Sequence, residues 1–276
     1  MDELNLLRKK TGMTIAKAWM LMIICVTVLF LGGGILGAVA SMNNIEPEPL
    51  LENGIFLIML LIISLSSIWG YFINKKKLPL FHKTSLLIYL LCLFIALSWS
   101  YISPLVLDFL PFNTIEAESL ERVEIELLLG ITLSLLFTIL QIGVIGHGLL
   151  KNYLFKQVIF TVVAVSIVMV IPQAVIGLIF QTAIMFYIYY RTASFQLPLL
   201  MTLSFSLVEY LCKLIWGHNI TTQNYIRIHL VPNPVLYQIG LLVAVLIIII
   251  GLYFIRKNTN PIVWQRPEED EDLAFL

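Results

Sequence analysis

Charged side chains are scarce in this sequence: they make up 12% of its 276 residues, while 59% of the residues are hydrophobic. Basic and acidic residues are equal in number, so the net charge is zero, which argues against nucleic acid as a partner. The mean hydropathy is +0.94. A soluble domain of this length cannot bury so much apolar surface, so the composition predicts a multi-pass integral membrane protein.

Cysteine and the usual catalytic motifs are also lacking. The three cysteines, Cys25, Cys92 and Cys212, all lie in apolar stretches, and none belongs to a Cys-x-x-Cys pair. We expect buried, inert thiols and not a disulfide framework or a zinc site. The sequence has no His-Glu-x-x-His motif, no nucleophile elbow and no glycine-rich phosphate loop. It therefore predicts neither a metal ion nor a cofactor.

Long apolar runs dominate what remains. Each run ends at charged residues, at a proline or at a polar loop, as membrane helices do. The runs cover residues 19–41, 54–73, 84–102, 124–150, 158–171, 174–190, 195–216 and 235–255. The sequence thus predicts an all-α membrane protein, a polytopic bundle of eight transmembrane helices.

These runs divide the chain into five parts. They are an N-terminal segment (1–18), helices one to three with an external segment (19–123), helices four to seven (124–216), an external loop with helix eight (217–257) and a tail (258–276). Residues 103–123 mix apolar and acidic side chains, and their apolar run is too short to cross, so we interpret them as interfacial or partly re-entrant. The acidic run Glu268–Asp272 predicts a disordered tail.

The distribution of basic residues predicts the orientation. With the N-terminus in the cytoplasm and eight spans, all but three of the 17 lysines and arginines fall on the cytoplasmic side; the exceptions are Arg122, Lys213 and Arg227. Cytoplasmic loops of membrane proteins carry such an excess. We therefore expect both termini to be cytoplasmic.

Three stretches in the middle of the chain carry a family resemblance. They are 140–148 (Leu-Gln-Ile-Gly-Val-Ile-Gly-His-Gly), 166–173 (Ser-Ile-Val-Met-Val-Ile-Pro-Gln) and 190–198 (Tyr-Arg-Thr-Ala-Ser-Phe-Gln-Leu-Pro). Their order and spacing resemble the core of the CPBP family of intramembrane proteins, which includes prenyl (CAAX) endopeptidases and bacteriocin-processing proteins. The resemblance implies a fold of eight helices, with an active site on helices four to seven.

The fourth helix of that family carries Glu-Glu-x-x-x-Arg-Gly. Aligning its Arg-Gly with His147-Gly148 places Ile142 and Gly143 where the family has its two glutamates. Gln141 is one position away, and its amide cannot act as a base. The family's pair of carboxylates is therefore absent at the matching positions.

The later motifs match in their scaffold and differ in their chemistry. The family's Arg-Thr-Gly-Ser turn resembles residues 191–194 (Arg-Thr-Ala-Ser), and Pro198 stands where the family has a proline. The family's Phe-x-x-x-His and His-x-x-x-Asn motifs fall on residues without an ionisable side chain: Met169, Gln173, Thr202 and Ser206.

The lost side chains are those that would activate a water molecule for attack on a peptide carbonyl. Such a step needs a general base and a group that holds the oxyanion. We therefore predict a non-catalytic, CPBP-like protein that binds and positions another membrane or cell-envelope protein in the lipid bilayer. The predicted binding cleft is formed by Gln141, Gly143, Gly146, Gln173, Thr202, Ser206 and Glu209.

Two alternatives remain open from the sequence. The chain could be an active endopeptidase with a rearranged site that uses Glu209, His147 or His218. It could instead be a carrier of a lipid or another small molecule, although the two matching halves typical of carriers are missing. A carboxylate deep in a span usually marks function, but Lys213 lies one turn after Glu209 and would neutralise it locally.

Overall fold

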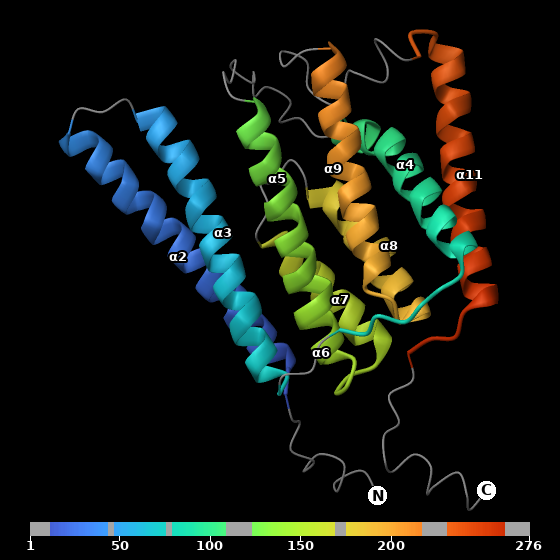
Figure 1. Cartoon of the computed structure of the whole chain (residues 1–276), viewed down its shortest axis with the longest axis horizontal. Coiled ribbons are helices and arrows are strands. Elements are labelled where there is room, and N and C mark those ends of the chain that lie inside the picture. The colour runs from blue at the N-terminus through green and yellow to red at the C-terminus, as the bar shows by residue number, and fades with distance from the viewer. Residues whose placement is uncertain are drawn as a thin grey trace, which may run out of the picture.

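The computed structural model describes residues 12–43, 47–75, 79–108, 123–168, 175–216 and 231–262. In these ranges the regular elements are helices (Figure 1). In chain order they are α2 (Ile15–Met42), α3 (Pro47–Ile73), α4 (Leu86–Asp108), α5 (Val123–Thr138), the π-helix η1 (Ile139–Gly146), α6 (His147–Leu149), α7 (Phe155–Ile167), α8 (Val175–Thr192), α9 (Gln196–Trp216) and α11 (Pro234–Asn258). One isolated antiparallel bridge pairs Phe81, before α4, with Ser194, after α8.

The predicted all-α membrane class is confirmed. Within the described residues each predicted apolar range falls mainly on a helix, and the fourth follows the continuous path of α5, η1 and α6. Five helical stretches are long and apolar enough to cross a membrane: Ile15–Met42, Gly54–Ile73, Leu86–Ser103, Gly130–Leu149 and Pro234–Asn258. The described parts of α7, α8 and α9 do not reach that length and hydropathy.

The start of α2 and the end of α4 differ from the predicted boundaries. Helix α2 begins at Ile15, inside the predicted N-terminal segment, because the Thr14 side chain caps it by accepting a hydrogen bond from the Lys17 N–H. Helix α4 continues to Asp108, inside the predicted interfacial segment. Residues 109–122 of that segment and the acidic run of the tail lie outside the described residues.

The helices run alternately up and down (Figure 1). Helices α2 and α3 pack together on one side of the molecule, α4 and α11 on the other, and α5, η1, α7, α8 and α9 fill the space between. Helix α2 begins and α11 ends at the same end of the bundle. We call this the basic end, because it carries every described lysine and arginine except Lys213: Lys17, Lys75, Lys83, Lys151, Lys156, Arg191, Arg256 and Lys257.

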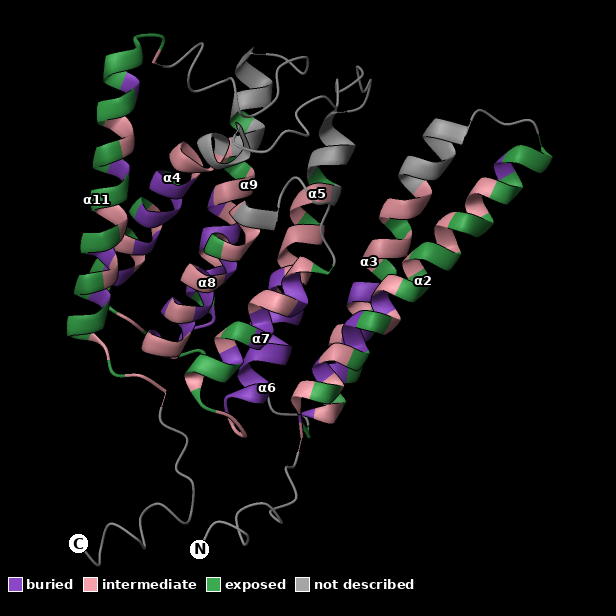
Figure 2. Ribbon diagram, turned by 180° about the vertical axis from the view of Figure 1, so that it is seen from behind, coloured by how far each residue is buried: buried purple, intermediate pink, exposed green. Residues whose placement is uncertain are grey.

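Buried residues concentrate in the middle helices. In Figure 2 they line the inner faces of η1, α7, α8 and α9, whereas α11 and the far part of α2 show exposed residues. The outward face of α11 is aliphatic, with Leu242, Leu246 and Ile249 more than half exposed. An apolar exterior around a polar-containing centre is what a helix bundle in lipid requires.

Candidate functional site

The π-helix η1 is the centre of the bundle. Every residue from Leu140 to Leu150 is buried, although three glycines stand among them. A π-turn widens the helix by one residue, and such turns occur often at functional sites. The widened turn ends at His147, whose backbone N–H points to the carbonyls of Ile142 and Val144. The sequence had predicted an ordinary helix here.

Two glycines of the predicted cleft face aromatic rings of the same chain. A Cβ atom on Gly143 would lie 2.9 Å from the Phe195 ring, and one on Gly146 would lie 2.5 Å from the Phe186 ring. Both rings are buried. On this side of η1, the chain's own side chains therefore fill the space that the prediction left for a partner.

Thr202 of the predicted cleft is bonded within the bundle. The hydroxyls of Thr138 and Thr202 lie 2.8 Å apart, and the Thr202 hydroxyl is 3.5 Å from the Met185 sulfur. These contacts join α5, α8 and α9 near the position that the family resemblance gives to a histidine. Ser206 lies one turn further along α9 and is half-buried. Gln173 and His218 lie outside the described residues, as does the side chain of Glu209.

His147 is part of a buried hydrogen-bonded chain. Its Nδ1 lies 2.7 Å from the Tyr189 hydroxyl, which also accepts a bond of 3.1 Å from the Leu80 backbone N–H. Because that N–H occupies a lone pair of the hydroxyl oxygen, the phenolic proton can go to Nδ1. The imidazole then accepts at Nδ1, and the pair anchors the segment before α4 to α8.

A small pocket lies on the opposite side of η1, against α3. We call it the α3–η1 pocket; it has a volume of about 240 Å³ and is lined by Ser67, Ile68, Tyr71, Asn74, Pro79, Ile139, Gly143 and Val144. Ser67, Tyr71 and Asn74 are spaced four and three residues apart, which places them on one face of α3. The Asn74 amide donates a bond of 2.8 Å to the Val144 carbonyl and ties α3 to the widened turn.

Hydrogen-bonding capacity around this pocket is left unused. The Ser67 hydroxyl and the Asn74 Oδ1 are buried and have no partner in the described structure, and neither has the Gln141 Nε2 in η1. Most buried polar atoms in proteins are paired, so unpaired ones in a cluster require an explanation. Of the predicted cleft residues, Gly143 lines this pocket.

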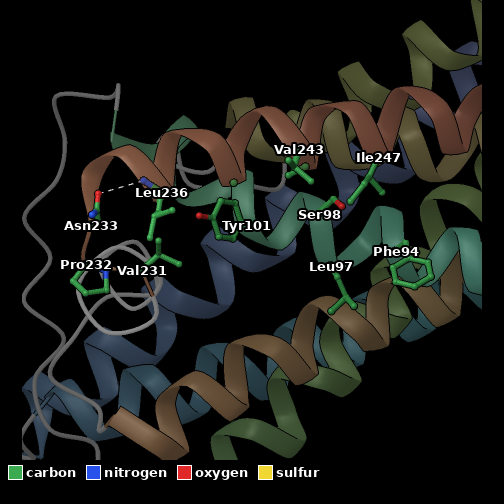
Figure 3. Close-up of a pocket in the computed structure, with 12 residues that line it drawn as sticks. Phe94, Leu97, Ser98, Tyr101, Val231, Pro232, Asn233, Leu236, Val243 and Ile247 are labelled. Carbon is green, nitrogen blue, oxygen red and sulfur yellow. Dashed lines mark hydrogen bonds between the residues drawn. The ribbon is translucent and has the colours of Figure 1, made fainter.

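A second, larger hollow opens between α4 and α11. This lateral groove has a volume of about 690 Å³, and its polar residues are Ser98, Tyr101 and Asn233 (Figure 3). Asn233 also caps α11 by accepting from the Val235 and Leu236 N–H groups. Aliphatic and aromatic side chains such as Phe94 and Leu97 make up the rest of the wall.

The described parts of the chain offer no cluster of metal-ligating side chains. No three His, Cys, Asp or Glu side chains there stand close enough to hold a metal ion. Cys25 and Cys92 are buried free thiols, and the Cys25 sulfur lies 2.9 Å from the Ser66 hydroxyl. The buried polar groups that surround η1 are amides, hydroxyls and one imidazole.

Sequence reasoning identified Gly143 and missed its neighbours on α3. Only the spacing of Ser67, Tyr71 and Asn74 could have indicated the pocket, since it places three polar groups on one face of an apolar helix. Comparison of the chain with protein-family models, with curated proteins and with solved structures gives no match.

Proposed function

We propose that this chain is a non-catalytic, CPBP-like membrane protein that binds a segment of another membrane or cell-envelope protein in the α3–η1 pocket. The observation that carries the proposal is the pocket itself: a hollow beside a π-helix, inside an apolar bundle, whose Ser67 hydroxyl and Asn74 Oδ1 lack partners. In hydrocarbon, unpaired polar atoms favour a partner that brings hydrogen bonds. An extended peptide segment brings both N–H and carbonyl groups.

The residues at the resembling catalytic positions favour binding over hydrolysis. Ile142 is a buried aliphatic side chain, Gly143 packs against Phe195, and Thr202 is bonded to Thr138. None of the three offers a base, which hydrolysis of a peptide bond requires. His147 is buried, and its Nδ1 is engaged with the Tyr189 hydroxyl.

The turn between α8 and α9 supports the family resemblance. Ala193 has a φ of 52°, in the left-handed region that favours glycine. Ala193 stands at the position where the resembling Arg-Thr-Gly-Ser turn has its glycine. Pro198 lies in the first turn of α9, where a missing N–H costs no helix bond.

A Ser67→Leu variant tests the binding site. The leucine side chain should fill the α3–η1 pocket and remove the unpaired hydroxyl, so we expect partner capture to fall about tenfold while folding is kept. Capture is measured with a photoreactive phenylalanine at Tyr71, which lines the pocket, followed by identification of the cross-linked protein. The same probe at Phe72, whose side chain is 56% exposed on the neighbouring face, is the matched position outside the pocket.

Gly130→Leu is the control for added bulk, because no described atom lies within 4 Å of a Cβ built at Gly130. If the probe at Tyr71 cross-links the partner as well in Ser67→Leu as in the wild-type protein, the pocket is not the binding surface. The enzyme alternative is tested on the same preparations with prenylated and leader peptides. If the wild-type protein cleaves these peptides and a folded His147→Ala variant does not, the protein is an enzyme and the binding proposal is wrong.

We also propose eight membrane spans with both termini in the cytoplasm. Support comes from the gathering of basic residues at the end of the bundle where α2 begins and α11 ends. We expect a reporter fused after Leu276 to read as cytoplasmic. A periplasmic or extracellular signal would contradict the proposed orientation.

Lipid binding is the second candidate function, and the lateral groove favours it. Its wall is apolar, with hydroxyl and amide groups of Tyr101 and Asn233 toward the start of α11 (Figure 3). A lipid has the same division between an apolar chain and a polar head. Cross-linking of lipid to a photoreactive phenylalanine at Phe94, which lines the lateral groove, together with lipid retained by the purified protein, would favour this function over partner binding.

A further inference from the structure

A polar cavity lies at the basic end of the bundle, away from both sites described above. We call it the end pocket; its volume is about 520 Å³, and three chain segments enclose it. These are the stretch before α4 with Lys83 and Thr84, the end of α8 with Arg191 and Thr192, and the end of α11 with the residues after it, including Asn258 and Asn260. Segments far apart in the sequence thus build a single cavity.

Backbone hydrogen bonds hold these segments in place. The His82 N–H donates to the Ala193 carbonyl at 3.0 Å, and the Phe195 N–H donates to the Leu80 carbonyl at 2.9 Å. The Ile262 N–H donates to the Tyr190 carbonyl at 2.8 Å. The cavity is therefore formed before any ligand arrives, which lowers the entropic cost of binding.

The charge of the end pocket is positive. Lys83 and Arg191 line it together with His82, and none of its lining residues is acidic. The guanidinium of Arg191 donates to the backbone carbonyls of Arg256 and Thr259, which fix its position and leave its charge without a counter-ion in the described structure. The described aspartate and glutamate positions, such as Asp108 and Glu209, lie toward the opposite ends of their helices.

Unused hydrogen-bond donors accompany this charge. The Arg191 Nε and the Thr84 hydroxyl are buried and have no partner in the described structure. Both residues line the end pocket. An arginine held in a fixed position with a free N–H, beside a lysine and a hydroxyl, matches the chemistry that binds the oxygens of a phosphate group.

From these observations we propose that the end pocket binds a phosphate group, supplied by the head of an anionic phospholipid. The end pocket lies where α4, α8 and α11 begin or end, at the level where a bilayer presents its headgroups. Arg191 and Lys83 provide charge, and Thr84 provides a neutral donor. Soluble phosphate shares this chemistry, and the experiment separates the two sources.

The test uses the full chain in neutral detergent, titrated separately with short-chain phosphatidylglycerol, short-chain phosphatidylcholine and inorganic phosphate. Thermal unfolding at each concentration gives an apparent Kd, because a ligand that binds only the folded state raises its stability. We expect Lys83→Gln to weaken the binding of phosphatidylglycerol about fivefold. Lys156→Gln, an exposed lysine at the same end of the bundle but outside the end pocket, should change it less than about twofold.

Thr84→Val separates a ligand site from a structural role. The valine keeps the shape of the side chain and removes a buried hydroxyl without a partner, so the ligand-free protein should be as stable as wild type or more stable. Binding of phosphatidylglycerol should nevertheless weaken about tenfold, since a donor to a charged oxygen is lost.

Stabilisation by phosphatidylglycerol but not by inorganic phosphate supports the lipid headgroup as the source. Stabilisation by both supports a phosphate site that soluble ligands also reach. Equal weakening by Lys83→Gln and Lys156→Gln would overturn the proposal, because diffuse surface charge would then explain the binding. Equal stabilisation by phosphatidylcholine, unchanged in Thr84→Val, would overturn it as well.

Discussion

Replacing Tyr189 by phenylalanine should lower the stability of the folded protein by about 1–3 kcal/mol, because the lost hydroxyl removes two hydrogen bonds, one with the buried His147 and one with the half-buried Leu80. The hydroxyl lies 2.7 Å from the His147 Nδ1 and accepts the Leu80 N–H at 3.1 Å. The ring itself is fully buried and keeps its packing in the variant. Thermal unfolding in a neutral detergent measures the loss.

Proteolysis shows where the loss acts. The Leu80 bond helps to hold the segment between α3 and α4 against α8, so this segment should be cleaved faster in Tyr189→Phe. Tyr190→Phe is the matched control, since Tyr190 is a neighbour on α8 whose ring stacks on Phe155 at a centroid distance of 4.1 Å. The Tyr190 hydroxyl makes no hydrogen bond in the described structure, so this control should unfold like wild type. Equal stability of the two variants would refute the anchoring role of Tyr189.

The second large effect is expected for Gly148→Ala. A Cβ atom at this position would lie 2.7 Å from the Met13 Cβ and 2.8 Å from the Asn74 Nδ2. The Asn74 amide cannot move freely, because it donates to the Val144 carbonyl in η1. We expect a net loss of about 1–3 kcal/mol after the helix-favouring effect of alanine is included.

Gly33→Ala is the control for this prediction. A Cβ atom at Gly33 meets no described atom within 4 Å, so the change should leave the protein as stable or stabilise it by up to about 1 kcal/mol. Both variants are compared by thermal unfolding in the same detergent. A Gly148→Ala protein as stable as Gly33→Ala would contradict the prediction, because it would show that Asn74 and Met13 can move away from the added methyl group with no loss of stability.

The helices could be predicted because apolar runs long enough to cross a bilayer leave the chain few choices of structure. Such runs must satisfy their backbone internally, and a helix does this. The range 235–255 therefore agrees closely with α11, and the range 54–73 ends with α3, although α3 begins earlier, at Pro47. The π-turn at Ile139–Gly146 could not be predicted in this way, since one extra residue per turn leaves the composition of the run unchanged.

The candidate site was only partly visible in the sequence. Gly143 was singled out by its position, but a single sequence does not show that Phe195 covers one side of it while α3 leaves a pocket on the other. Both facts depend on contacts between helices distant in the chain. The pairing of α4 with α11, which creates the lateral groove, depends on such contacts in the same way.

That pairing also determines when the protein can be completed during its synthesis. Helix α4 packs against α11, with Ile95 seated at Gly251 and Tyr101 against Tyr237. The ribosome makes α4 before α5 to α9 and α11 after them, so the face of α4 that contacts α11 has no partner while the helices between them are inserted. The interface between α4 and α11 therefore forms only after the helices between them have been inserted, and insertion factors that shield this face of α4 should matter more for the yield of folded protein than those that act on α2 and α3.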